Sequence, residues 1–169
     1  MATSTLARLA PLMSAAWRAK VDVAMTHSLT LRSISQLGLE ATAMSWAPRA
    51  LSVLRIVAGL LCIEHGMQKL FDFPASGHGA VPLFSFSGLT GSLEFVGGFF
   101  MIIGLFTRQT AFILSGMMAV AYWTAHAPKS FFPAVNGGDA AILFSFLFLY
   151  FVFAGGGPWS LDAKRTSED

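Results

Sequence analysis

Four long apolar stretches alternate with short segments that hold most of the turn-forming residues of the chain. The stretches run from about residue 50 to 71, 88 to 106, 109 to 127 and 139 to 155. About 20 apolar residues in an α-helix cross a hydrocarbon core of about 30 Å. The segments between Gly104 and Arg108 and between Asn136 and Gly138 carry glycine, asparagine and polar residues typical of turns. The pattern predicts four membrane-spanning helices, of which the fourth is short.

Composition favours the membrane interpretation over a soluble helical domain. Of 169 residues, 54% are hydrophobic and 12% are charged, and the mean hydropathy is +0.63. A soluble domain carries about 25% charged residues. The third and fourth stretches could also be core helices of a soluble protein, but the chain has too little polar sequence to cover such a core. We therefore expect an all-α integral membrane four-helix bundle.

The distribution of Lys and Arg predicts the orientation. Eight cationic residues fall on one side of the four predicted spans: Arg8, Arg18, Lys20, Arg32, Arg49, Arg108, Lys164 and Arg165. Only Lys69 and Lys129 fall on the other side, and Arg55 lies within the first span. Positive loops stay in the cytoplasm. Both termini are therefore expected to be cytoplasmic, with a membrane domain over 47–163 and a tail over 164–169.

Residues 1–46 differ from the rest in being rich in Ser, Thr and Ala with scattered Arg. We expect an N-terminal extension that is poorly ordered or lies on the surface as a helix. Two alternatives stay open: a mitochondrial transit peptide, whose composition is similar, and a true start at Met44, next to the first span. The single cysteine, Cys62, excludes an internal disulfide and a Cys-rich metal site.

Ionisable residues inside the apolar stretches are the candidates for chemistry. Such a residue costs about 2.5–3.5 kcal/mol at the centre of a bilayer, so it usually has a partner or a function. With a rise of 1.5 Å per residue, His65 and Glu94 both lie about 9 Å below the outer ends of their helices. Six candidates are expected to face one interior, mostly in its outer half, as a substrate-binding site: Arg55, His65, Lys69, Glu94, His126 and Asp139.

Several alternatives to a binding role remain at the sequence level. Glu94 could form an ion pair that holds the first two helices together, or it could bind a ligand or a proton. Arg55 could be a structural counter-ion or an anion-binding group. Glu64 falls opposite Arg55 on the helix, and the sequence shows no partner for it. Glycines on the Glu94 face are expected to let the helices approach closely: Gly91, Gly97, Gly98 and Gly104.

The ordered set of these residues resembles the DoxX family. It comprises Arg55, His65-Gly66 with Lys69, Gly91 with Glu94 and Gly97-Gly98, the Gly104–Arg108 turn, His126, Gly137-Gly138-Asp139 and Ser160 with Asp162. The resemblance covers about residues 46 to 163. It implies a four-helix bacterial inner-membrane protein, related to the small subunit of a thiosulfate:quinone oxidoreductase, with quinone as a ligand class. Asp139 departs from the pattern, where Glu is expected as often.

Three functions are compatible with the sequence, which does not decide whether the chain is an enzyme. The first is a membrane subunit of a redox complex that binds a quinone between His65 and Glu94, with electrons from a partner protein. The second is a non-enzymatic scaffold or anchor for soluble redox partners. The third is a small proton-coupled transporter. We expect no resident cofactor and no metal, a homo-oligomer as one possibility, and no nucleic-acid partner, because the basic residues are spread along the chain.

Overall fold

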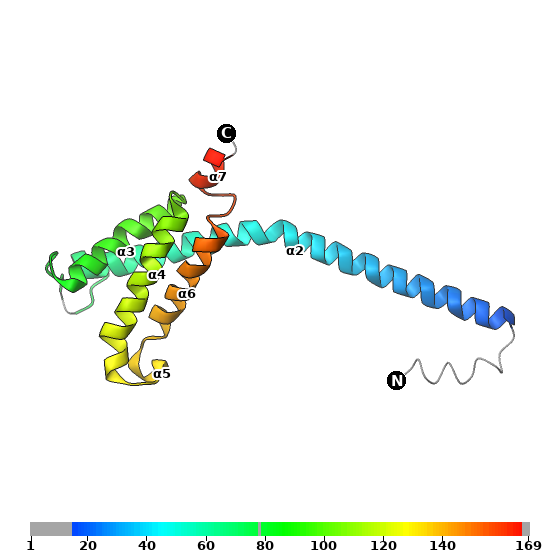
Figure 1. Ribbon diagram of the computed structural model, residues 1–169, viewed down its shortest axis with the longest axis horizontal. Helices are drawn as coiled ribbons and strands as arrows, with labels where there is room; N and C mark the ends of the chain where they lie inside the picture. The colour runs from blue at the N-terminus through cyan, green and yellow to red at the C-terminus, as the bar shows by residue number, and fades with distance from the viewer. Residues whose placement is uncertain (1–14, 78, 167–169) are drawn as a thin grey trace. The chain divides into compact units, whose positions relative to one another are not determined.

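The computed structural model describes residues 15–77 and 79–166, and in this part of the chain every regular element is a helix. The predicted all-α class is therefore confirmed. The chain forms four longer helices and several short ones, whose arrangement is drawn in Figure 1. The longer helices are α2 (Ala15–Phe71), α3 (Phe86–Ile103), α4 (Thr107–Ala121) and α6 (Asp139–Ala154). The short elements are η2 (Tyr122–His126), η3 (Ala127–Lys129), α5 (Pro133–Asn136) and α7 (Leu161–Thr166).

The chain divides into two compact units, Met1–Trp46 and Ala47–Asp169, with the boundary inside α2. In the first unit, the helix starts at Ala15, and residues 1–14 lie outside the described part. A helix was one of the two expectations for this segment, but the sequence did not predict that it would be continuous with the first apolar helix. Pro48 lies within the helix and cannot donate a backbone hydrogen bond. The Ser52 hydroxyl donates to the Pro48 carbonyl at 3.2 Å, a side-chain hydrogen bond to the backbone one turn earlier.

In the Ala47–Asp169 unit, the four predicted stretches are all helical, with small differences at their ends. The first ends at Phe71, as expected, and the fourth runs over Asp139–Ala154. The second ends at Ile103 instead of continuing to Phe106, because Gly104 adopts a left-handed conformation with φ 67°. The regular α-helix of the third stretch ends at Ala121, and η2 continues it to His126.

Close packing between α2 and α3 depends on glycine. A Cβ atom on Gly66 would lie 2.6 Å from the Phe95 nitrogen and 2.7 Å from the Gly91 carbonyl oxygen. A Cβ atom on Gly98 would lie 2.6 Å from the Gly59 carbonyl oxygen. Real side chains do not tolerate such distances to backbone. The two helices therefore approach each other as closely as they do only because these positions lack side chains.

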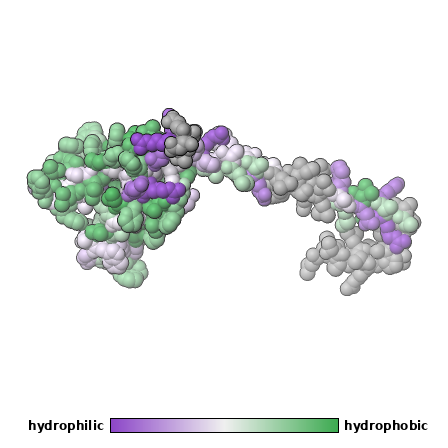
Figure 2. All heavy atoms as spheres, turned by 45° about the horizontal axis from the view of Figure 1, so that its top comes forward, coloured by the Kyte–Doolittle hydropathy of each residue, from purple (hydrophilic) through white to green (hydrophobic). Residues whose placement is uncertain are grey.

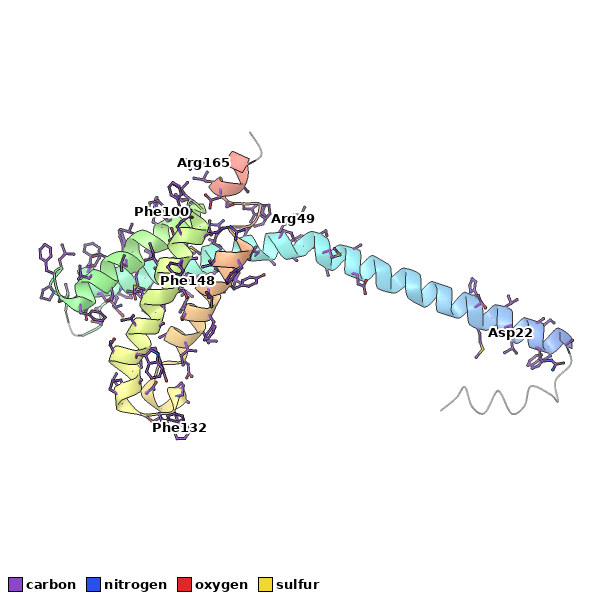
Figure 3. The ribbon with its side chains drawn as sticks, in the orientation of Figure 1. Asp22, Arg49, Phe100, Phe132, Phe148 and Arg165 are labelled. Atoms are coloured by element: carbon purple, nitrogen blue, oxygen red, sulfur yellow. The ribbon has the colours of Figure 1, made fainter. Side chains whose placement is uncertain are left out.

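One hydrophobic core joins the four helices in this unit. Phe148 and Phe151 of α6 are fully buried, and Figure 3 shows Phe148 between the helix axes. Helices α4 and α6 lie side by side (Figure 1), and Ser115 and Ser145 each donate to the other's carbonyl oxygen, at 2.8 and 3.1 Å. The core contains nine buried residues: Ala58, Cys62, Met101, Ala111, Leu114, Met117, Met118, Phe148 and Phe151.

The outside of the same unit is also hydrophobic. Figure 2 shows hydrophobic residues over most of the visible face of this unit. Large apolar side chains such as Phe112, Leu143 and Phe146 are about two-thirds exposed, at 67%, 70% and 67%. Soluble monomers rarely expose continuous apolar patches of this kind. By length and composition, two helical segments of the described chain could cross a membrane, Glu40–Phe71 and Phe86–Ile103, and the shorter α6 is also apolar.

Candidate functional site

Helix α3 carries the buried carboxylate around which the candidate site is built. Ser85 caps its first turn by accepting a hydrogen bond from the Gly88 nitrogen at 3.0 Å. Glu94 follows two turns into the helix and is only 4% exposed. Thr90 lies one turn before Glu94, on the same face, and is also buried. The helix thus presents a hydroxyl and a carboxylate, one above the other, toward α2.

Lys69 of α2 pairs with this carboxylate. Its Nζ atom lies 2.7 Å from Glu94 Oε1 and 3.5 Å from Thr90 Oγ1. The Lys69 side chain is one-third exposed, whereas that of Glu94 is almost fully buried. The ion pair therefore connects α2 and α3 at the level of Gly91, where an added Cβ atom would lie 2.9 Å from Lys69 Cβ.

The second oxygen of the same carboxylate is not satisfied. Glu94 Oε2 is buried and has no hydrogen-bond partner among the residues that the structure describes. An unpaired buried acceptor of this kind costs about 1–3 kcal/mol, and more when it is charged. Unpaired buried acceptors are rare in native protein structures, and a bound ligand that supplies the missing donor is one explanation.

His126 enters the site from the end of a π-helical turn. The element η2 follows α4 directly, and π-turns occur frequently at functional sites. His126 Nδ1 lies 3.1 Å from the Asn136 carbonyl oxygen, and the imidazole stacks on Tyr122 with ring centroids 6.5 Å apart. With Nδ1–H donating to that carbonyl, Nε2 is left as an acceptor. Asn136 is itself held because its amide donates to the Ser130 carbonyl at 2.8 Å.

A cavity of about 250 Å³ lies between these groups, and we call it the polar pocket. Its charged and titratable wall consists of His65, Lys69, Glu94 and His126, and the rest of the wall is apolar or glycine. The structure thus brings together four of the six candidate residues. His65 is exposed and shares the pocket with Glu94, but the direct partner of Glu94 is Lys69. The remaining lining residues are Met118, Ala121, Gly137, Ala140, Ala141 and Phe144.

Asp139 and Arg55 do not line this pocket. Asp139 is exposed at the first turn of α6, where a carboxylate stabilises the helix dipole. Arg55 is fully buried elsewhere, among backbone carbonyls. Its guanidinium donates to the oxygens of Gly156 at 2.8 Å, Ile102 at 2.6 Å and Trp159 at 2.7 Å, and also to Met101. Of the interpretations left open for Arg55, these contacts favour a structural one.

Sequence reasoning gave no role to three residues that the structure uses. Thr90 contacts Lys69, and its position four residues before Glu94 was the available signal. Asn136 orients His126, although only its place in a turn was noted. Asp162 accepts hydrogen bonds from the backbone nitrogens of Phe106 at 2.9 Å and Thr107 at 2.8 Å, so it caps α4 from far along the chain.

The four glycines that were predicted to let the helices approach closely have different neighbours in the structure. Gly91 and Gly98 allow the approach of α2, and a Cβ atom on Gly97 would lie 2.9 Å from a side-chain methyl group of Leu114 in α4. Gly104 lies beyond the end of α3. Its left-handed φ and its contact with Ser160 both require glycine at this C-cap.

Comparisons with known proteins agree with the pattern of these residues. A sequence model of the DoxX family matches residues 50–127, which include Arg55, the four titratable residues of the polar pocket and the glycines of α3. An uncharacterized protein of Haemophilus influenzae is 47% identical over 127 residues, an alignment covering 70% of this chain and 92% of that protein. The chain belongs to the DoxX family. No solved structure matches this DoxX protein.

Proposed function

We propose that this DoxX protein is a multi-pass membrane subunit of a redox complex and that its polar pocket binds a quinone headgroup. In this proposal α2, α3, α4 and α6 cross the bacterial inner membrane as a bundle, with both termini in the cytoplasm. The single observation that carries the proposal is the buried Glu94 oxygen that lacks a partner while it lies beside a cavity. Intramembrane acids are functional candidates by default.

The groups around the pocket match the hydrogen-bonding needs of both quinone states. A quinone carbonyl accepts hydrogen bonds, and Lys69 is a donor. A quinol hydroxyl donates, and Glu94 Oε2 or His126 Nε2 could accept from it. Reduction of a quinone to a quinol takes two electrons and two protons. In the proposal, His65 and Glu94 exchange the protons with the bound headgroup, and a partner protein supplies the electrons.

An apolar groove beside the pocket supports a ligand with a hydrocarbon tail. A cavity of about 510 Å³ lies mainly between α3 and α4, with Leu93, Ile113 and Gly116 among its lining residues. Thr90 also lines it, and the Thr90 hydroxyl lies 3.5 Å from Lys69 Nζ. Thr90 on the wall of the groove thus contacts Lys69 on the wall of the polar pocket, an arrangement that supports a lipid-soluble ligand with a polar head.

Quinone titration of the purified full-length protein tests the proposal. A short-tailed quinone is titrated into wild type, Glu94→Gln, His65→Ala and the control Asp139→Asn, which removes a carboxylate outside the pocket. Loss of one hydrogen bond to a charged group is expected to weaken binding about 10-fold in the two pocket variants. Affinities equal to wild type in both pocket variants would remove the site.

One observation favours a scaffold role as the second candidate. The Lys69–Glu94 ion pair joins α2 to α3 and could serve only to hold the helices in register. A purely structural protein would still bind its soluble partner after the Glu94→Gln substitution and would show no quinone-dependent activity. Isolation of the complex from membranes, with and without this substitution, separates the two candidates.

A further inference from the structure

Glu64 lies in the middle of the outward face of α2. Its neighbours on that face are apolar and exposed: Val57 by 45%, Leu60 by 53% and Leu61 by 40%. The opposite face of the helix, with Ala58, Gly59 and Cys62, is buried against the rest of the unit. No hydrogen bond or ion pair reaches the Glu64 carboxylate from residues 15–77 or 79–166. If α2 spans the membrane, as the proposed function requires, this carboxylate faces lipid without a partner.

Lipid tails cannot compensate such a group, because they offer no hydrogen-bond donor. A residue of this kind almost always faces another protein segment or water.

The outward face of α2 also has the spacing of a helix-pairing seam. Leu54, Val57, Leu61, Glu64 and Gln68 follow one another at intervals of three and four residues, the a and d positions of a heptad pattern.

We infer that a second copy of this chain covers the outward face of α2. The two α2 helices would run parallel, since both copies insert in the same orientation. In such a seam, each side chain inserts among four side chains of the facing helix. His65 flanks the seam directly after Glu64, is exposed, and has no hydrogen-bond or ion-pair partner among the described residues. A two-fold axis places Glu64 of each copy beside His65 of the other, so the carboxylate and the imidazole both gain a hydrogen-bond partner.

The proposed contact between Glu64 of one copy and His65 of the other also affects the polar pocket. His65 lines that pocket, so Glu64 of the second copy would stand behind one of its walls and orient the imidazole. The second copy is preferred to an unrelated helix because this chain already carries the complementary group at the same depth. The dimer would thus give each pocket a positioning residue from the other chain.

Disulfide cross-linking in native membranes tests the inference with the full-length protein. Val57→Cys places a thiol in the centre of the seam, whereas Leu143→Cys places one on the outer face of α6, where Leu143 is 70% exposed. The native Cys62 is buried and serves as the wild-type control. Oxidation should give a product of twice the 18.1-kDa chain mass in Val57→Cys only. No product, an equal product in Leu143→Cys, or a product with another protein would overturn the inference.

Further variants test the role of the charges. Glu64→Ala and His65→Ala, each combined with Val57→Cys, should lower the cross-linked fraction about 8-fold, because each change removes both symmetry-related interhelical hydrogen bonds of the dimer. Because both changes break the same pair, the combination should lower it no further. An undiminished product in Glu64→Ala, or a combined loss equal to the product of the two, contradicts the pairing.

Failure of the dimer and failure of the proposed function give different results. A chain recovered from the membrane fraction that never cross-links through Val57→Cys contradicts only the dimer. A chain recovered from the soluble fraction contradicts the membrane placement on which both depend. Quinone affinity is measured separately and does not depend on the cross-link.

Discussion

Arg55 and Glu94 are both buried charges, yet their surroundings give them different roles. Arg55 places its guanidinium among four backbone carbonyls. Glu94 lines a cavity, with one oxygen bound to Lys69 and the other buried without a partner in the described chain. At the scale of single residues, stability is therefore expected to depend on the first, and binding on the second.

Substitution of Arg55 by Lys should destabilise the protein without changing its ligand affinity. Lys has a point charge in place of the planar guanidinium fork and cannot reach all four carbonyls. With hydrogen bonds to charged groups worth about 1.5–3 kcal/mol each, we expect a loss of about 3 kcal/mol in the free energy of unfolding. Thermal unfolding and quinone titration of the folded variant measure the two effects. A weakened affinity with unchanged stability would assign Arg55 to the binding site instead.

Removal of Lys69 alone should cost more stability than removal of the whole ion pair. Lys69→Met leaves a buried carboxylate with no partner, and we expect a loss of about 2 kcal/mol. The double variant Lys69→Met, Glu94→Gln removes the charge as well and should recover part of that loss. Thermal unfolding of the two variants and of Glu94→Gln completes the comparison. Additive losses would show that the two side chains do not interact energetically.

At the scale of elements, the contact between α2 and α3 is set by glycine, whereas the surface of α4 has room. Gly66 is buried against the backbone of α3, while a Cβ atom on Gly116 of α4 would meet nothing within 4 Å. Substitution by alanine at these two positions therefore measures two effects on stability separately, that of helix packing at Gly66 and that of helix propensity at Gly116.

Gly66→Ala should destabilise the protein, and Gly116→Ala should stabilise it. The new methyl group at Gly66 forces the two helices apart, a strain of about 1–3 kcal/mol. At Gly116 it only removes the conformational freedom of glycine, a gain of about 0.5–1 kcal/mol. Thermal unfolding under identical conditions gives both signs. Equal effects at the two positions would show that the close approach of α2 and α3 has no energetic weight.

The groove between α3 and α4 should make quinone affinity depend on tail length. Gly116→Leu fills part of the groove without touching the polar pocket. Binding of a tail-less quinone should stay constant, while the gain from a long tail should fall about 10-fold, as expected when roughly two buried CH₂ groups lose their contacts. The measurement is a pair of titrations with tail-less and long-tailed quinones. A tail-independent affinity in wild type would exclude the groove as the tail site.

The apolar pattern predicted which segments are helical, but it could not predict where all of them end. Helix α4 begins at Thr107 because Asp162 caps it, and that contact joins residues far apart in the sequence. The grouping of His65, Lys69, Glu94 and His126 followed from helix spacing and from equal depth. The preference of Glu94 for Lys69 depends on side-chain reach, and the separate place of Arg55 depends on loop carbonyls, neither of which a sequence pattern contains.

At the scale of the whole molecule, the proposed orientation has a direct test. A fluorescent protein fused after Arg165 should fold and fluoresce, because the C-terminus is expected in the cytoplasm. Alkaline phosphatase fused after Ser130, in the connection between α4 and α6, should be active, because that connection is expected outside. The reversed pair, phosphatase after Arg165 and fluorescent protein after Ser130, serves as the control. Activity in the reversed pair would invert the predicted topology.

The contacts of Arg55 also set an order of events during synthesis. Its partners Gly156 and Trp159 follow it by 101 and 104 residues. Two other acceptors, Met101 and Ile102, follow by only 46 and 47 residues. The ribosome must therefore pass residue 159 before this guanidinium acquires all four acceptors, and Asp162, which caps α4, emerges later still. A product interrupted after α6 but before these residues would retain every apolar segment and yet leave the cation with half of its acceptors, a defect by which quality-control proteases could recognise unfinished copies.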